Sequence, residues 1–388
     1  MRLEDVCTVF TDGDWIESKD QSEKGIRLIQ TGNIGEGLYL EKESRAKYIS
    51  EDTFKKLKCT EIFPGDILVS RLPEPIGRAC IVPERTGRMI TAVDCTICRP
   101  DETLISKEYL CYFMQSNAYY TRLLANVTGT TRKRISRKNL GNVELEVPTK
   151  EEQNTIVERL DCLVKVIDSR TKELQLLDNL IKARFVELFG DPILNPYSWA
   201  VVTVGDIVTD VRYGTSKPAV EGGKYPYLRM NNLTYDGHLD LSDMKYIDIP
   251  DNEIEKCIVR KGDVLFNRTN SIELVGKTCV FDLADDMVIA GYIIRVRLNE
   301  KLLPIVLSSY MNLPSLKEQL RSMAKGAVNQ ANINAQELQS IKIYLPPMEL
   351  QEQFSAFVKQ VDKSKVVVQE ALDKTQLLFD SLMQKYFG

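Results

Sequence analysis

Two stretches of the chain carry apolar residues at alternating steps of four and three, the pattern of a helix that buries one stripe in a coiled coil. In the first stretch, eight of ten such positions are apolar. The ten positions are Ile156, Leu160, Leu163, Ile167, Arg170, Leu174, Leu177, Ile181, Arg184 and Leu188. A proline precedes each stretch, and Gly190 followed by Asp191-Pro192 ends the first. The pattern predicts helices of about 40 residues, rods of roughly 60 Å that act as spacers.

The second stretch is a copy of the first. Residues 138–190 align with residues 336–388 without a gap, at an offset of 198, and both copies end in Phe-Gly. The ten seam positions become Phe354, Val358, Val361, Lys365, Val368, Leu372, Thr375, Phe379, Leu382 and Tyr386, and again eight are apolar. The chain is therefore a tandem duplication, and its two helices most simply pack on each other.

The segments before the helices show short β-branched or aromatic runs broken by Gly, Pro, Asn and Asp, as is typical of mostly β domains. In both copies a Gly-Asp turn precedes an apolar run, which leads to Arg71 in the first and Arg268 in the second. We expect an α+β protein with two mostly β domains, residues 1–148 and 191–346, separated by helical segments 149–190 and 347–388.

Composition and charge restrict the function. With 43% hydrophobic and 27% charged residues, a net charge of -4 and a single histidine, the 388-residue chain has the composition of a globular protein. One histidine excludes a His-based triad in each copy and a multi-histidine metal cage. The N-terminus has no cationic region followed by an apolar run, and no run of 18 apolar residues occurs, so we expect a cytoplasmic protein that crosses no membrane and has reduced cysteines.

Motifs for catalysis and metal binding are weak or missing. No Walker loop, no Gly-rich cofactor loop and no Asn/Asp-Pro-Pro-aromatic pattern of adenine methyltransferases occurs. Cys95 and Cys98 have a metal-like spacing, but the second copy has Ile293 and Val296 there, which favours buried strand positions over a zinc site. His238 lies beside a turn, and a role at the surface or in packing is favoured over a role as a metal ligand.

The local distribution of charge, unlike the net charge of the chain, indicates nucleic-acid binding. Residues 130–138 contain five cations and no acid: Arg132, Lys133, Arg134, Arg137 and Lys138. Such a loop can neutralise phosphates or contact guanine, although a solvated charge run is the competing interpretation. The matching stretch, residues 325–334, replaces cations with amides, and Asn and Gln side chains can contact adenine N6 and N7. Its Lys325, Asn329 and Gln330 are candidate DNA contacts.

Further candidate contacts in the second copy are Arg212, Lys217, Arg229 and Asn232. Arg71 and Arg268 are candidates as well, because each emerges just past a predicted strand. A plain surface or turn role is the alternative for each of these residues. The different chemistry of the two matched loops is what we expect if each copy reads a different short base sequence.

Taken in order, the motifs resemble a known family. Each copy contains, in the same order, Gly-Asp-Ile/Val-Leu-x-x-Arg, then Leu-Glu-Val-Pro-x-x-x-Glu-Gln or Tyr-Leu-Pro-Pro-x-Glu-Leu-Gln, then a long helix that ends in Phe-Gly. This duplicated series resembles the specificity subunit of type I restriction-modification systems. The resemblance covers essentially the whole chain. It implies two target-recognition domains, held apart by an antiparallel helix pair, that each read half of an interrupted site on double-stranded DNA.

The resemblance also implies partners: two methyltransferase subunits, which bring S-adenosylmethionine, and restriction subunits, which use ATP. The chain itself would be non-catalytic and bind no cofactor. Two alternatives stay open, a methyltransferase or nuclease with a cryptic site and a structural coiled-coil adaptor that binds other proteins. If the helices act as a ruler, their length sets the gap between the two half-sites.

Overall fold

The computed structural model describes residues 1–127, 133–327 and 330–388. The chain divides into two compact units, unit 1 with Met1–Arg170 and Ala371–Gly388, and unit 2 with Thr171–Glu370. We call residues 1–149 of unit 1 head 1 and residues 190–347 of unit 2 head 2. Each unit thus combines one head with a segment of both long helices.

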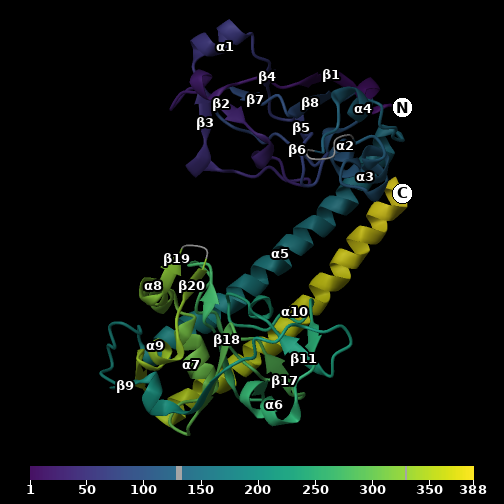
Figure 1. Ribbon diagram of the computed structural model, residues 1–388. Coiled ribbons are helices and arrows are strands. Elements are labelled where there is room, and N and C mark those ends of the chain that lie inside the picture. Colours follow the sequence, from purple (N-terminus) through teal and green to yellow (C-terminus); the bar gives the residue numbers. More distant parts are fainter. Residues whose placement is uncertain (128–132, 328–329) are drawn as a thin grey trace. The chain divides into compact units, whose positions relative to one another are not determined.

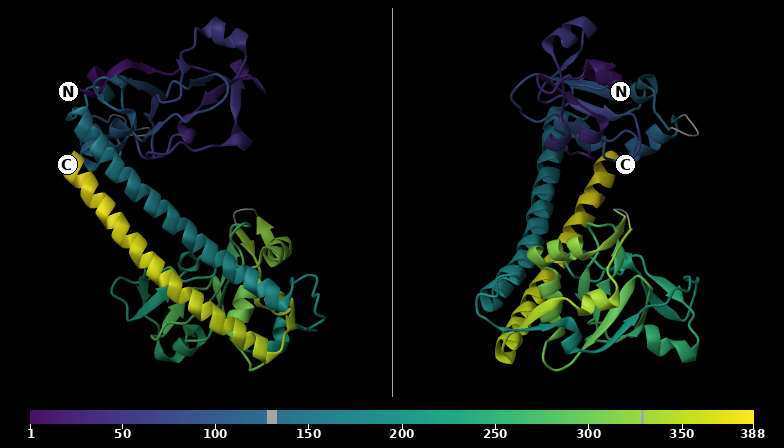
Figure 2. Two further views of the ribbon diagram at one scale, coloured as in Figure 1. Left: turned by 180° about the vertical axis from the view of Figure 1, so that it is seen from behind. Right: turned by 60° about the vertical axis from the view of Figure 1, so that its left-hand side comes forward.

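Two long helices, α5 (Lys150–Phe189) and α10 (Met348–Phe387), run uninterrupted for 40 residues each (Figures 1 and 2). All twenty predicted seam positions are buried or half-buried. In unit 1, Arg159 near the start of α5 donates to the Tyr386 hydroxyl near the end of α10 at 2.9 Å. In unit 2, the ring of Phe185 lies 5.4 Å from that of Phe354. Within each unit the two helix segments are therefore antiparallel, as predicted.

A buried glutamine joins each long helix to its head. The Gln153 side chain accepts from the Ser106 amide at 2.8 Å and donates to the carbonyls of Leu104 and Pro148, both at 2.9 Å. Gln351 makes the matching three bonds in unit 2, to the Leu303 amide and to the carbonyls of Lys301 and Pro346. Because all polar atoms of both side chains are satisfied, burial costs little and fixes the helix start against the head.

Head 1 contains two four-stranded sheets. One has the order β1-β8-β5-β6 and the other the order β3-β2-β7-β4. The strands are β1 (Cys7–Asp12), β2 (Ile26–Ile29), β3 (Lys47–Ile49), β4 (Glu61–Ile62), β5 (Ile67–Ser70), β6 (Ala79–Ile81), β7 (Met89–Thr91) and β8 (Cys95–Pro100). The helices are α1 (Glu51–Leu57), α2 (Lys107–Phe113), α3 (Asn117–Leu124) and α4 (Arg137–Gly141).

Head 2 repeats both sheets, with the orders β10-β18-β14-β16 and β12-β11-β17-β13. These strands are β10 (Val208–Tyr213), β11 (Tyr225–Leu228), β12 (Lys245–Ile247), β13 (Ile258–Val259), β14 (Val264–Asn267), β16 (Thr278–Val280), β17 (Met287–Ile289) and β18 (Ile293–Leu298). Two small sheets add β9 (Ala200–Thr203), β15 (Thr269–Asn270), β19 (Lys325–Ala327), β20 (Gln330–Asn332) and β21 (Lys342–Leu345). The helices are α6 (Asp251–Cys257), α7 (Pro304–Met311), α8 (Pro314–Met323) and α9 (Ala335–Gln339).

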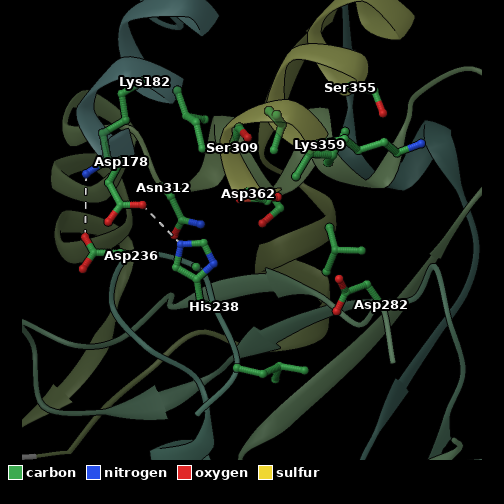
Figure 3. A pocket seen from close by; sticks show the side chains of 17 residues that line it. Asp178, Lys182, Asp236, His238, Asp282, Ser309, Asn312, Ser355, Lys359 and Asp362 are labelled. Carbon is green, nitrogen blue, oxygen red and sulfur yellow. Dashed lines mark hydrogen bonds and ion pairs between the residues drawn. The ribbon is translucent and has the colours of Figure 1, made fainter. Parts of the chain in front are cut away.

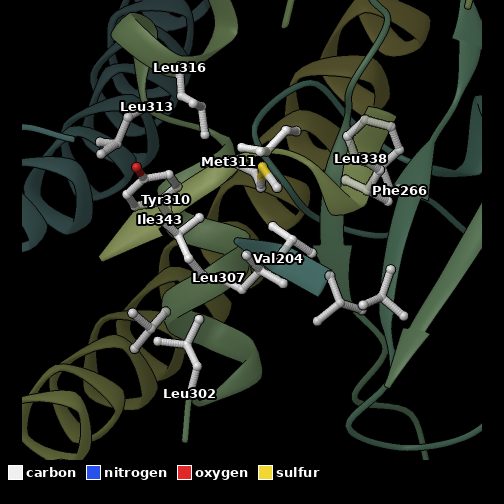
Figure 4. Close-up of a cluster of buried hydrophobic side chains, with 14 of the residues drawn as sticks. Val204, Phe266, Leu302, Leu307, Tyr310, Met311, Leu313, Leu316, Leu338 and Ile343 are labelled. Carbon is white, nitrogen blue, oxygen red and sulfur yellow. The ribbon is translucent and has the colours of Figure 1, made fainter. Parts of the chain in front are cut away.

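The duplication extends to details of register and charge. Strand β1 of head 1 and its counterpart β10 of head 2 carry an irregularity at the same place, between Cys7 and Val9 and between Val208 and Asp210. In both heads a buried aspartate pairs with an arginine on the central strand, Asp66 with Arg99 and Asp263 with Arg297. The core of head 2 lies between its sheet and helices, with residues such as Phe266, Leu307 and Ile343 (Figure 4). A residue-by-residue comparison of the heads is therefore meaningful.

Candidate nucleic-acid interface

In head 1 the segment that carries the basic cluster crosses the ends of three strands. The amide of Arg71, just past β5, donates to the Asp94 carbonyl at 2.9 Å, and the Ile135 amide donates to the Arg71 carbonyl at 3.3 Å. Asp12 ends β1 beside them. We call Asp12, Arg71, Asp94, Arg134 and Arg137 the strand-end face of head 1.

This face is a network of arginines and aspartates. Arg134 lies 3.0 Å from Asp94, and Arg137 lies 4.0 Å from Asp12. The Arg134 and Arg137 side chains remain 45% and 48% exposed. Exposed pairs of this kind contribute at most about 1 kcal/mol, so they orient the guanidinium groups more than they stabilise the head.

Head 2 builds the same place with different chemistry. The Arg268 amide donates to the Tyr292 carbonyl and the Ile333 amide donates to the Arg268 carbonyl, both at 2.9 Å. Tyr213 stands where head 1 has Asp12, and the Arg268 guanidinium lies 4.8 Å from the centre of the Tyr213 ring. We call Tyr213, Arg268, Tyr292 and Asn332 the strand-end face of head 2.

The two faces offer different groups to a ligand. Arg134 and Arg137 present donors that fit phosphate oxygens or the O6 and N7 atoms of guanine. In head 2, Tyr213 and Tyr292 are 43% and 48% exposed and present aromatic rings and hydroxyls. One framework thus carries a cationic face in one head and an aromatic, amide-bearing face in the other.

Two predicted contact residues lie inside the heads. Arg71 is 4% exposed, and its guanidinium donates to the Val93 carbonyl and pairs with Asp12. Burial lowers the pKa of Arg71, while the charge of Asp12 opposes the effect. Asn232 is 2% exposed and donates to the Asp240 carbonyl, so it closes a turn. Both side chains are therefore buried within the heads and directed to groups of the protein itself, which differs from the exposed position expected of a contact residue.

Four other predicted cations are exposed or half-exposed but held by neighbouring acids. The pairs are Arg212 with Asp210, Lys217 with Glu253, Arg229 with Asp243, and Lys325 with Glu337. Arg212 neighbours Tyr213 on β10, so its side chain projects to the opposite face of the sheet. Lys133, Lys138 and Gln330 are exposed. Arg132 and Asn329 lie outside the described residues.

The sequence interpretation missed Tyr213, Tyr292 and the acids Asp12 and Asp94. Their signal is present: Cys95 aligns with Ile293, which places Asp94 over Tyr292. Asp12 and Tyr213 lie further upstream, where the offset between the copies changes from 198 to 201 residues. Only the matched strand registers make that pairing certain.

The two cysteines with metal-like spacing do not share a site. Cys95 and Cys98 are fully buried on β8, an odd number of residues apart, so they face opposite sides of the sheet and enter different core clusters. Burial raises the pKa of the Cys95 thiol to about 11. In the part of the chain that the structure describes, no three metal-binding side chains come together.

His238 joins a polar cluster at the surface of unit 2, where its side chain is 45% exposed (Figure 3). Its Nε2 lies 3.3 Å from Asp178 on α5 and 2.8 Å from the Lys365 ammonium on α10. Burial opposes ionisation of Asp178, but the hydrogen bonds from His238 and Lys365 hold its pKa at about 2. None of the helices in the described ranges is long and apolar enough to cross a membrane.

Comparison with known protein families places these features in context. A family model described as the type I restriction modification DNA specificity domain matches residues 1–179 and again residues 196–374. The specificity subunit of the type I restriction enzyme EcoKI from Escherichia coli (strain K12) is 24% identical to this chain over 316 residues, which cover 76% of this chain and 67% of that protein. The MjaX specificity subunit of Methanocaldococcus jannaschii is 29% identical over 196 residues, 50% of this chain and 46% of that relative.

Solved structures share the fold. A chain from a study of complex assembly and conformational transition of the type I R-M system aligns with a TM-score of 0.58 at 20% identity, covering 100% of this chain and 96% of that one. The type I restriction-modification S subunit from M. genitalium gives a TM-score of 0.53 at 16% identity, with 100% and 95% covered. At these identities the likeness concerns the fold.

Proposed function

Because the chain belongs to the type I restriction modification DNA specificity family, we propose that it reads an interrupted, asymmetric DNA target, one half with each head. The chain is a specificity subunit, so it recognises DNA and assembles with other subunits, and it is not itself the enzyme. We propose two methyltransferase subunits and the restriction subunits as its partners. These partners supply the S-adenosylmethionine and ATP chemistry.

One observation carries the proposal: the strand-end faces of the two heads share a backbone framework and differ in their side chains. Where head 1 has Asp94 and Arg134, head 2 has Tyr292 and Asn332. A reader of an asymmetric target needs such a pair of faces, because identical faces would favour a symmetric site. Phosphate contacts position a protein on DNA, whereas contacts to base edges specify the sequence.

The exposed arginines make head 1 the candidate for a half-site that contains guanine. Arg134 and Arg137 can each donate two parallel hydrogen bonds to guanine O6 and N7. For head 2, the exposed Gln330 can pair with adenine N6 and N7. The Asn332 oxygen accepts from the Thr269 hydroxyl at 2.9 Å, which leaves its amide nitrogen to donate to adenine N7. The Tyr292 ring can pack on a thymine methyl group. The near-neutral charge of the chain supports a role for partner subunits in holding the phosphates.

The test uses the chain together with its methyltransferase partner. Adenine methylation is mapped on a library of DNA sequences for the wild type, for Arg134→Ala and for Asn332→Ala. Arg134→Ala should relax base preference in one half-site only, and Asn332→Ala in the other. Equal weakening on every sequence would show that these side chains contact phosphates, and an unaltered pattern for both variants would refute the assignment of the faces.

A cryptic methyltransferase is distinguished by the chain alone. Incubation of the purified chain with DNA and labelled S-adenosylmethionine should transfer no methyl group until the partner is added. Transfer without the partner would overturn the recognition role.

A further inference from the structure

Unit 2 contains a cavity of about 250 Å³ between head 2 and its segments of the two long helices (Figure 3). Three helices line it, with residues that include Ile181 on α5, Ser309 on α7, and Ser355 and Asp362 on α10. On one side, His238 lies within 3.3 Å of Asp178 on α5 and 2.8 Å of the Lys365 ammonium on α10. A cavity of about 150 Å³ can hold a benzene ring, so this cavity has room for a small ligand.

The two units can be compared at this place because α2 and α7 begin in the same way. The amide of Ser106 in unit 1 and the amide of Leu303 in unit 2 each bond to the buried glutamine of a long helix. Counted from these two residues, Tyr112 of unit 1 corresponds to Ser309 of unit 2. A large ring in one unit is therefore replaced by a small hydroxyl side chain in the other.

The Tyr112 ring is buried against both long helices of unit 1. Its hydroxyl donates to Asp161 on α5 at 2.6 Å, and its ring centre lies 6.4 Å from that of Phe379 on α10. The residues that correspond to these two partners in unit 2 are Lys359 and Ile181, and both line the cavity. The cavity is therefore the space that a tyrosine ring fills in unit 1.

The lining of the cavity is also more polar than the matching place in unit 1. Val157 and Val164 of unit 1 correspond to Ser355 and Asp362 of unit 2. Asp362 is half-buried, and within the described ranges it has neither a hydrogen bond nor an ion pair. Burial raises the pKa of Asp362, while the charge of Lys365 opposes the shift. A buried carboxylate is costly unless a cation or a hydrogen-bond donor pairs with it.

A second acceptor lies at the end of α7. The Asn312 side chain donates from its amide nitrogen to the Thr278 carbonyl at 2.7 Å. Its Oδ1 atom is buried and has no hydrogen-bond partner among the residues that the structure describes. Because Asn312 and Asp362 both line the cavity, a donor placed there can serve both acceptors.

The other charged groups of the lining are paired or exposed. Asp178 pairs with Lys365 at 2.6 Å, and Asp236 pairs with Lys182 at 3.7 Å. The remaining two, Asp282 and Lys359, are exposed and carry opposite charges. Among the described lining residues, Asp362 is therefore the charged group that is both half-buried and unpaired.

We propose that this cavity binds a small aromatic molecule that carries a cationic ammonium or amidinium group. The ring takes the place of the Tyr112 ring, against Ile181 and Val358, and the cation donates to the Asp362 carboxylate and to Asn312 Oδ1. Such charge-assisted hydrogen bonds are stronger than those between neutral groups. The small volume and the position of His238 across one side favour a free molecule over a segment of a partner protein.

A series of ligands with one ring and different charges tests the chemistry of the site. The probe is para-fluorobenzylamine, a cation at neutral pH, and its binding to the full chain is followed by fluorine NMR. Saturable binding is expected. The neutral para-fluorobenzyl alcohol and the anionic para-fluorobenzoate should bind at least about tenfold more weakly, because they cannot form the charge-assisted bonds.

Variants of the chain locate the site. Asp362→Asn should weaken binding of the amine by about tenfold and leave binding of the alcohol nearly unchanged, whereas the matched control Asp282→Asn, at an exposed carboxylate of the lining, should have little effect. The double variant Ser309→Tyr, Lys359→Asp rebuilds the tyrosine and its acceptor of unit 1 and should abolish binding. Gln360→Tyr, at an exposed position of α10, should not.

Four outcomes would overturn the proposal. They are the absence of saturable binding, equal binding of the amine, the alcohol and the benzoate, undiminished binding to the double variant, and equal weakening by Asp362→Asn and Asp282→Asn. Displacement of the probe by the methyltransferase partner would make a partner side chain, and not a free molecule, the occupant. Asp362→Asn adds no volume, so it decides the question even if the double variant does not fold. The cavity shares no residue with the strand-end faces, so its test is independent of the test of DNA reading.

Discussion

A buried lysine makes the stability of unit 2 depend on pH in a predictable direction. Lys317 on α8 is 3% exposed, and its ammonium donates to the Gly276 carbonyl at 2.7 Å. Burial lowers its pKa from 10.5 to about 7, with a smaller effect in the same direction from Arg321, while Asp236 opposes the shift. We predict that Lys317→Met stabilises unit 2 at neutral pH, because it removes the cost of burying a charge.

The sign and size follow from proton linkage. The folded pKa lies below the unfolded pKa, so between about pH 7 and pH 10.5 the unfolded chain binds more protons and the wild type becomes more stable as pH rises. The difference between the folded and unfolded pKa values corresponds to roughly 5 kcal/mol. The variant also loses one hydrogen bond, which offsets about 1 kcal/mol of this gain. Lys317→Met should therefore be more stable than wild type by a few kcal/mol at pH 7 and by little or nothing near pH 10.

Urea unfolding between pH 7 and pH 10 measures this difference. The chain has two tryptophans, Trp15 in unit 1 and Trp199 in unit 2, so a Trp15→Phe background makes fluorescence report unit 2. Lys261→Met, at an exposed lysine of the same head, is the matched control and should leave the pH dependence unchanged. If the difference between wild type and Lys317→Met is flat across this pH range, the ammonium is not buried as described.

Three further outcomes are expected. Replacing Gln351 by Leu should lower the free energy of unfolding of unit 2 by about 3 kcal/mol, because three buried backbone groups lose their partner, and Gln153→Leu should have the same effect on unit 1. Calorimetry that shows no change in either variant would refute the role of these glutamines. Removing seven residues from each long helix shortens each by about 10 Å, so methylation mapping should find a gap shorter by about three base pairs, and an unchanged gap would exclude the ruler. Tyr292→Ala should change base preference only in the half-site that Asn332→Ala affects, whereas effects in both half-sites would contradict the assignment to head 2.

The long helices could be predicted from the sequence because their signals are local. Seam spacing, the preceding proline and the closing Gly190 define 149–190 as helical, and α5 spans Lys150–Phe189. The same reasoning gives α10 through the repeat. For the heads, the sequence predicts mostly β structure but not the strand order, because strand pairing depends on contacts between residues far apart in the chain.

The buried charges could not be predicted for the same reason. Arg295 is 1% exposed on β18, where its partners are Asp210 and the Ile258 carbonyl, 85 and 37 residues away. Arg71 does leave the end of its strand as expected, but its guanidinium turns back to Asp12, 59 positions earlier in the sequence. Sequence alone predicts that a charged side chain at a strand end is exposed, because the distant residue that pairs with it is not visible in the local pattern. The burial of such side chains therefore cannot be predicted.

Comparison of the two heads separates residues that maintain the fold from residues free to specialise. Tyr119 in head 1 donates its hydroxyl to the Gly77 carbonyl at 2.9 Å, and Lys317 donates to the matching Gly276 carbonyl. Here the chemistry changed and the hydrogen bond was kept, which is the mark of a structural position. On the strand-end faces the reverse holds, since the backbone bonds at Arg71 and Arg268 are kept while the side chains around them no longer make equivalent contacts. Divergence without a conserved contact is expected where the partner of a side chain lies outside the protein, and this supports the proposal that the strand-end faces carry the reading surface.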